Sequence, residues 1–169
     1  MAMAQQIASP TAYFELSFCP SLALVSTVRR FVATFYENVL ADPDVTSRVA
    51  LAAHELLENA VKYSIDGETN IRVDVTPEPN NILHICIRTR NLSTPEHIEL
   101  LRGYFSDMKK MPDPLLFYTD LMARKAKTNV GSGLGLGRIA AEAELALDLV
   151  VEGNMVEIRA TADVPGGVA

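Results

Sequence analysis

A two-faced helical segment at about residues 45–63 constrains the fold of this chain more than any other feature. Apolar residues recur there with helical spacing and occupy one arc of the predicted helix, namely Val49, Ala50, Ala53, Leu56, Leu57, Ala60 and Val61. Glu55, Asn59 and Lys62 fall within about 60° of one another on the opposite arc, at about 100° per residue. One face must therefore pack on another layer of structure, while the other displays a carboxylate, an amide and an ammonium group.

The polar arc of this helix has two interpretations. Periodicity alone favours a solvated face, which most amphipathic helices have. A functional site would use the same groups differently: Glu55 to accept a proton, the amide oxygen of Asn59 to bind Mg²⁺, and Lys62 to bind phosphate. The spacing leaves both interpretations open. A zinc-protease site is excluded, because Glu58 stands where the motif H-E-x-x-H requires its second histidine.

Four glycines stand in the seven-residue segment 131–137, GSGLGLG, directly before a predicted helix. Glycine allows backbone N–H groups to wrap an anion, and a helix start attracts negative charge. A flexible hinge is the alternative, but Leu134 and Leu136 are unlike the polar residues that linkers favour. No Lys-Ser or Lys-Thr pair follows and no register gives G-x-G-x-x-G, so the Walker A and Rossmann loops are excluded. The segment predicts a phosphate loop of another type.

The order of the predicted elements sets the fold class. Strands are expected at 13–18, 70–76, 82–88, 146–152 and 155–162, and helices at 21–40, 45–63 and from the glycine segment to about 145. The stretch 91–130 is expected to be a lid-like helical insert with two short helices, and 1–10 and 163–169 to be frayed. This order predicts one domain over 1–169, an α+β two-layer sandwich with helices on one face of a mixed, mostly antiparallel sheet.

The composition suits a compact domain, since 49% of the 169 residues are hydrophobic and 21% are charged. A net charge of −6 argues against nucleic acid or an anionic membrane as partner. The chain has no apolar run of the roughly 18 residues that cross a bilayer, and its first residues lack the pattern of a signal peptide. Cys19 and Cys86 lie in apolar contexts without C-x-x-C spacing, which predicts reduced core thiols in a cytoplasmic protein.

Two motifs carry a family resemblance. The run ELLENA, 55–60, matches the form E-x-x-x-N-A, and GSGLGL, 131–136, matches G-x-G-L-G-L. Together, in this order and with strands and an insert between them, they resemble the GHKL or Bergerat-fold superfamily, which includes gyrase-type ATPases, histidine kinases and bacterial anti-sigma-factor serine kinases. The opening segment 14–35, FELSFCPSLALVSTVRRFVATF, is similar to the first strand and helix of the anti-sigma-factor kinases of partner-switching systems.

The resemblance implies the Bergerat fold, ATP and Mg²⁺ as ligands, and a role for each motif residue. Glu55 would activate the hydroxyl that attacks ATP, Asn59 would hold Mg²⁺, and Lys62 would lie near phosphate. The residues of the glycine motif would bind the nucleotide phosphates; they are Gly131, Ser132, Gly133, Leu134, Gly135 and Leu136. The implied partners are a small antagonist protein of the anti-anti-sigma type and a sigma factor or phosphatase, with a homodimer as a further expectation.

The chain departs from the family at the adenine motif. The family carries D-x-G-x-G after the second middle strand, whereas this chain has RTRNLS at 88–93. Asn91 can offer an amide oxygen to the adenine amino group, but it carries no charge. Losing one partner of a buried polar contact costs about 1–3 kcal/mol, which weakens binding by roughly ten- to a hundredfold. The phosphate half of the family pattern is present, and the base-binding half is not.

Three functions follow, and the first is favoured. It is an ATP-dependent serine/threonine kinase that regulates bacterial signal transduction through a small antagonist protein. The second is a degenerate GHKL domain that regulates a partner by binding alone, which the missing adenine motif favours. The third is a stand-alone histidine-kinase catalytic domain, against which Glu55 at the base position argues. In the insert, Arg124, Lys125 and Lys127 form either a phosphate contact or, as is favoured, a solvated basic patch.

Overall fold

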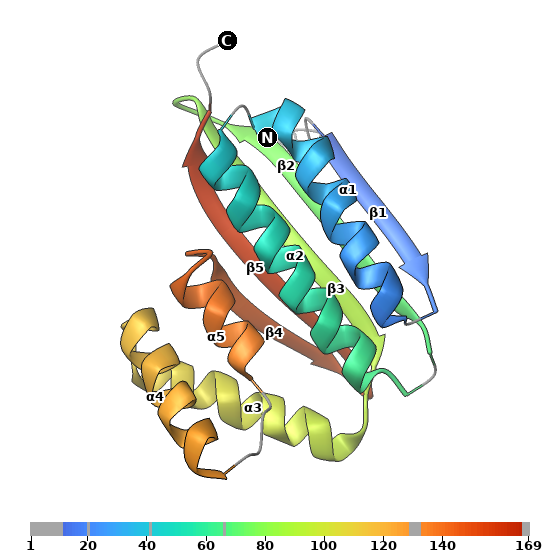
Figure 1. Ribbon diagram of the computed structural model, residues 1–169, viewed down its shortest axis with the longest axis vertical. Helices are drawn as coiled ribbons and strands as arrows, with labels where there is room; N and C mark the ends of the chain where they lie inside the picture. The colour runs from blue at the N-terminus through green and yellow to red at the C-terminus, as the bar shows by residue number, and fades with distance from the viewer. Residues whose placement is uncertain (1–11, 20, 41, 66, 129–132, 167–169) are drawn as a thin grey trace, which may run out of the picture.

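The computed structural model describes residues 12–19, 21–40, 42–65, 67–128 and 133–166 (Figure 1). Its strands are β1 (Ala12–Phe18), β2 (Thr69–Glu78), β3 (Ile82–Leu92), β4 (Ala146–Glu152) and β5 (Met155–Pro165). Its helices are α1 (Leu22–Leu40), α2 (Pro43–Tyr63), α3 (Pro95–Lys110), α4 (Pro114–Thr128) and α5 (Leu134–Ala141). The strands form one sheet in the order β1-β2-β3-β5-β4, and each neighbouring pair is antiparallel.

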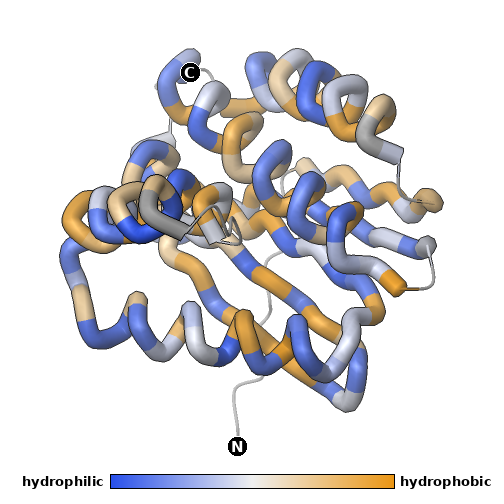
Figure 2. The backbone as a smooth tube through the Cα atoms, turned by 60° about the horizontal axis from the view of Figure 1, so that its bottom comes forward, coloured by the Kyte–Doolittle hydropathy of each residue, from blue (hydrophilic) through white to orange (hydrophobic). Residues whose placement is uncertain are grey.

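The molecule has two layers, with α1, α2 and α5 over one face of the sheet (Figure 1). Side chains alternate along β2, where Ile71, Val73 and Val75 are fully buried against the helices. Arg72 and Asp74 lie between them and face away from the helices. Figure 2 shows the same alternation of hydrophobic and hydrophilic residues along the strands. The predicted α+β two-layer class is confirmed, and the described part of the sheet is antiparallel throughout.

The start of α2 corrects one prediction. The helix predicted from about residue 45 starts two residues earlier, because Asp42, which stands between α1 and α2, caps it. Oδ1 of Asp42 accepts hydrogen bonds from the backbone N–H of Asp44 at 2.9 Å and of Val45 at 3.2 Å, and Pro43 stands in the first turn. The helix therefore begins at Pro43, and it positions every residue of the first predicted motif.

The insert and the C-terminus also differ from expectation. Strand β3 extends to Leu92 because its end pairs with β5, with Arg90 opposite Glu157 and Leu92 opposite Met155. Helices α3 and α4 have 16 and 15 residues and are not short. Strand β5 reaches Pro165 with Val164 buried, so the chain is paired over part of the tail expected to fray, while 1–10 lies outside the described residues. Helix α5 ends at Ala141, before the expected end near 145.

The prediction of core thiols is wrong for both cysteines. Cys19 follows the end of β1 and is exposed, and Cys86 is half-buried. Cys86 lies between the buried Ile85 and Ile87 of β3, so the alternation of the strand turns it away from the helices. No helix in the described ranges is both long and apolar enough to span a membrane.

Candidate functional site

A cavity of about 920 Å³ lies between α2 and α5 and is referred to below as the α2–α5 cavity. It is lined by His54, Glu55, Glu58, Asn59, Val61, Lys62, Tyr63, Lys125, Gly133, Leu134, Gly135 and Arg138. The two sequence motifs, which are more than seventy residues apart, therefore meet at one site. The cavity brings together six of the predicted site residues, namely Glu55, Asn59, Lys62, Gly133, Leu134 and Gly135.

Of the other four predicted residues, two lie elsewhere in the described structure and two lie outside it. Leu136 is 2% exposed and belongs to the hydrophobic core. Asn91 lines a different cavity at the end of β3. Gly131 and Ser132 lie outside the described residues.

Helix α2 supplies the polar wall of the cavity. Glu55, Asn59 and Lys62 stand at i, i+4 and i+7, so they follow one another along a single helix face. The Lys62 ammonium also lies 5.1 Å from the centre of the Tyr63 ring. Lys125 adds a cation from α4. Two residues of the predicted basic patch differ in the structure: Arg124 pairs with Asp120 on its own helix at 2.6 Å, while Lys125 lines the cavity. The side chain of Lys127 lies outside the described part of the chain.

Helix α5 supplies the opposite wall with its first turn. Gly133 caps the helix at a φ of 99°, a conformation that side-chain-bearing residues rarely adopt. A Cβ there would lie 2.8 Å from the ring of Tyr104. The first backbone hydrogen bond of the helix runs from Gly137 to the Gly133 carbonyl at 3.0 Å, so the N–H groups before it have no acceptor within the helix. Such a helix start attracts anions.

Gly135 has a second role that the phosphate-loop interpretation missed. A Cβ at this position would lie 2.5 Å from Oε2 of Glu55. Glycine therefore lets α5 approach α2 closely enough to cover the Glu55 carboxylate. The packing explains why Glu55 is only 7% exposed, although the helical wheel placed it on the polar face.

Glu55 is also bound by a residue that sequence reasoning did not single out. Nη1 of Arg138 donates a hydrogen bond to Oε1 of Glu55 at 2.6 Å. Nε and Nη2 of Arg138 both donate to Oε2 of Glu142 at 3.1 Å. These contacts raise the pKa of Arg138, with the hydrogen bond to Glu142 as the largest cause and attraction to Glu55 next among those that raise it. In the sequence, the one indication that Arg138 belongs to the site is that it directly follows the glycine segment.

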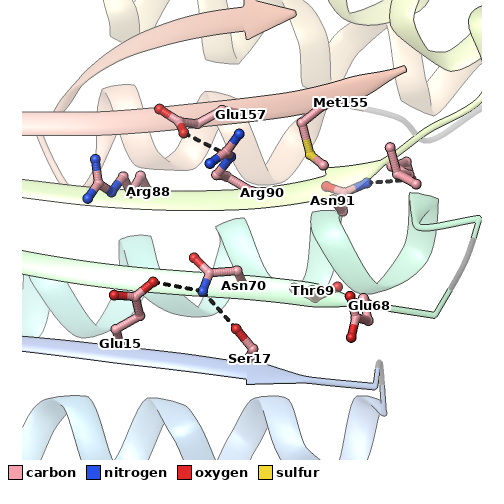
Figure 3. A pocket seen from close by; sticks show the side chains of 11 residues that line it. Glu15, Ser17, Glu68, Thr69, Asn70, Arg88, Arg90, Asn91, Met155 and Glu157 are labelled. Atoms are coloured by element: carbon pink, nitrogen blue, oxygen red, sulfur yellow. Dashed lines mark hydrogen bonds and ion pairs between the residues drawn. The ribbon is translucent and has the colours of Figure 1, made fainter. Parts of the chain in front are cut away.

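The end of β3 is a different environment (Figure 3). Asn91 is 8% exposed, and its Nδ2 donates a hydrogen bond to the Leu92 carbonyl at 3.1 Å. It lines a cavity of about 380 Å³ together with Arg88 and Arg90 of β3 and Glu157 of β5. Figure 3 shows the ion pair between Arg90 and Glu157 across that cavity, which has an N···O distance of 3.3 Å.

Next to Asn91, the C-terminal end of α2 is closed by α3. The rings of Tyr63 and His97 stack with centroids 3.6 Å apart and planes 11° from parallel. Oγ of Ser93 donates to the Tyr63 carbonyl at 3.2 Å. His97 is 6% exposed, and burial, followed by the charge of Lys62, lowers its pKa. Its Nδ1 is buried without a hydrogen-bond partner among the described residues.

The comparisons with known proteins concern the fold. No protein-family model matches the sequence, and no curated protein matches it. A chain from the crystal structure of the SiaB–SiaC complex from Pseudomonas aeruginosa matches with a TM-score of 0.57 and 17% sequence identity, over 89% of this chain and 89% of that chain. The two chains share a fold. The histidine kinase domain of the blue-light-activated histidine kinase from Erythrobacter litoralis EL346 has a TM-score of 0.41 and 13% identity, over 98% of this chain and 66% of that one.

Proposed function

We propose that this protein binds ATP and Mg²⁺ in the α2–α5 cavity and is a GHKL-type serine/threonine kinase of a partner-switching system. Its substrate would be a hydroxyl group on a small partner protein. One observation carries the proposal: the base candidate Glu55, the metal-ligand candidate Asn59 and the phosphate-ligand candidate Lys62 line one cavity with the start of α5. The shared fold with a chain of the SiaB–SiaC complex, a structure of two proteins, supports a protein partner.

The residues of the cavity suit a triphosphate. The N–H groups at the start of α5, which have no acceptor within the helix, point their positive ends out of it, and Lys62 and Lys125 add two cations. Gly133 exposes its backbone there, since it has no side chain to cover it. An anionic ligand is favoured at a site of this kind even though the whole chain has a net charge of −6.

The residues also suit a magnesium ion and a proton acceptor. Mg²⁺ prefers oxygen ligands, which the side-chain amide of Asn59 offers beside the phosphate-binding groups. When bound, the ion neutralises charge on the phosphate oxygens during transfer. Glu55, one helical turn away, would accept the proton of the attacking hydroxyl.

A second function, partner regulation without catalysis, is favoured by the end of β3. Tyr63 and His97 stack on each other there, and Asn91 donates its amide hydrogen to the backbone. The amide oxygen of Asn91 is the group expected to accept a hydrogen bond from the adenine amino group. Because the rings of Tyr63 and His97 pack on each other, recognition of a base at this end is less well supported than recognition of phosphate.

The binding experiment is calorimetric titration of ATP-Mg²⁺ into the wild type, Asn59→Ala and Asn38→Ala. Asn38 lies exposed on α1, where its side chain bonds the Thr34 carbonyl, so it is a matched control. We expect micromolar binding to the wild type and the control, and a loss of about tenfold or more in Asn59→Ala. Absence of binding to the wild type at millimolar nucleotide would refute the kinase and leave the partner-binding function.

The catalytic experiment is a phosphotransfer assay with a small partner protein that co-purifies with the chain. Glu55→Gln should lower the transfer rate by about 10²–10⁴-fold, because general bases contribute that much. Glu37→Gln, at an exposed position of α1, should keep the wild-type rate. An acid-stable phosphorylated product identifies a serine or threonine acceptor, whereas an acid-labile product would indicate a histidine and the histidine-kinase alternative.

A further inference from the structure

The Glu55 carboxylate is not free to act as a base in the structure. Its Oε1 already accepts a charge-assisted hydrogen bond from Arg138, and its Oε2 lies against Gly135. Helix α5 covers it, so that only 9% of the side chain is exposed. A hydroxyl group entering the α2–α5 cavity would therefore meet a carboxylate that is occupied.

Arg138 is placed where a phosphate could compete for it. Its side chain is 39% exposed and lines the α2–α5 cavity. Arg138 stands four residues after Leu134, so both lie on one face of α5, and side chains on a helix lean toward its N-terminus. The guanidinium binds Glu55, whose other carboxylate oxygen lies against Gly135 in the first turn of α5, so it lies near the helix start that attracts anions.

We propose that Arg138 is a switch between Glu55 and the polyphosphate of the bound nucleotide. Without nucleotide, Arg138 binds Glu55 and prevents it from accepting a proton. When a triphosphate occupies the cavity, the guanidinium moves to it and releases Glu55. The inference rests on the proposed function and adds to it a means by which nucleotide binding frees the base.

The chemistry of the two ligands supports an exchange. Arg138 holds Glu55 through one nitrogen, whereas phosphate groups are commonly bound by two parallel N–H···O bonds of a guanidinium. Glu142 holds Nε and Nη2 from the same helix, with 44% of its side chain exposed. This second carboxylate keeps the arginine stem on the cavity wall, so that a modest rotation of the side chain suffices.

Calorimetry with ATP-Mg²⁺ and with inorganic tripolyphosphate tests the exchange in four proteins: the wild type, Arg138→Met, Glu55→Gln and the double variant. Arg138→Met should weaken both ligands by about tenfold. Glu55→Gln should increase the affinity for both ligands more in the wild-type background than in the Arg138→Met background. The reason is that the Glu55 carboxylate competes with the ligand for Arg138 only where the arginine is present. Arg102→Met, which removes an exposed arginine on α3, should change neither affinity.

A spectroscopic measurement reports the movement directly. The Nε–H resonance of Arg138 can be assigned by its absence in Arg138→Met, and it should shift when tripolyphosphate is added to the wild type. The Nε–H resonance of Arg102 should stay in place. If Arg138→Met does not fold, Arg138→Lys keeps the charge with fewer donors and should give a smaller loss of affinity than the tenfold expected for methionine.

The outcomes separate this inference from the proposed function. Equal ATP affinity in the wild type and Arg138→Met, with an unmoved resonance, overturns the switch and leaves the ATP site standing. Tripolyphosphate binding that depends on Arg138, with ATP bound no more tightly than tripolyphosphate, supports the switch and contradicts adenine recognition. Binding of neither ligand overturns both.

Discussion

The α2–α5 cavity and the end of β3 adjoin at Tyr63, which lines the cavity and accepts a hydrogen bond from Ser93, yet the two regions are built differently. In the cavity, charged groups from α2, α4 and α5 line a hollow and meet an open helix start. At the end of β3, Tyr63 and His97 stack on each other and Asn91 bonds the backbone. The comparison shows that the groups proposed to bind nucleotide line a cavity in one region, while the neighbouring region is filled by side chains of the protein itself.

The backbone explains the difference. Gly135 lets α5 approach α2, and Gly133 lets the Tyr104 ring of α3 pack against the start of α5. The connection from β3 to α3, in contrast, has no glycine: the strand runs to Leu92 and α3 begins at Pro95. Oγ1 of Thr94 caps that helix by accepting a hydrogen bond from the N–H of His97 at 3.2 Å, which fixes the histidine beside Tyr63.

The largest effect that we expect comes from Gly133→Ala, which tests the glycine wall of the cavity. Its φ of 99° is unfavourable for alanine, and the new Cβ would lie 2.8 Å from the Tyr104 ring. We expect the free energy of unfolding, measured with urea, to fall by about 2–4 kcal/mol from backbone strain and overpacking together. The ring must move for the methyl group to fit.

Gly153→Ala is the matched control, because Gly153 also has a positive φ, of 60°, but a Cβ there would meet nothing within 4 Å. It should cost only the backbone term of about 1 kcal/mol. An equal loss of unfolding free energy in the two variants would show that Tyr104 does not pack on Gly133. The contrast between the α2–α5 cavity and the end of β3 would then be weaker.

Sequence reasoning predicted the frame of this site but not its contacts. The apolar arc of α2 and the order of strands and helices could be inferred because periodicity is a local property. The bond between Glu55 and Arg138 joins residues 83 apart and depends on how α5 packs on α2. The length of β3 likewise depends on its partner, since Arg90 and Asn91 read as loop until they pair with Glu157 and Val156.

A smaller effect on the free energy of unfolding is expected from pH, through the stacked pair of Tyr63 and His97. Burial lowers the pKa of His97 below its ordinary value of 6.5, so the imidazole stays neutral in the folded protein while the unfolded chain protonates it. Below that pH the unfolded chain binds more protons, and the free energy of unfolding should fall by up to about 1 kcal/mol between pH 6.5 and 5.5. Above pH 7 this contribution should be constant.

His97→Phe keeps a ring against Tyr63 but removes the titrating group, so its urea-denaturation curve should lose this part of the slope. Tyr63→Phe keeps both the ring and His97, and it should retain the wild-type slope. An identical pH dependence in the wild type and His97→Phe would mean that His97 is not buried against Tyr63, and the end of β3 would then be open as the α2–α5 cavity is.

The smallest effect is expected from Asn91→Ala. The side chain lies in the cavity at the end of β3 and gives its amide hydrogen to the Leu92 carbonyl, away from the groups proposed to bind phosphate. Calorimetry should therefore show ATP-Mg²⁺ affinity within about threefold of the wild type, a change of about 0.6 kcal/mol or less. Tripolyphosphate serves as the control ligand, because it has no base.

If Asn91 accepts a hydrogen bond from the adenine amino group, the affinity of Asn91→Ala for ATP will instead fall by roughly ten- to a hundredfold while its affinity for tripolyphosphate stays the same. That result would extend the nucleotide site from the α2–α5 cavity to the end of β3 and would require the Tyr63–His97 pair to accommodate a base.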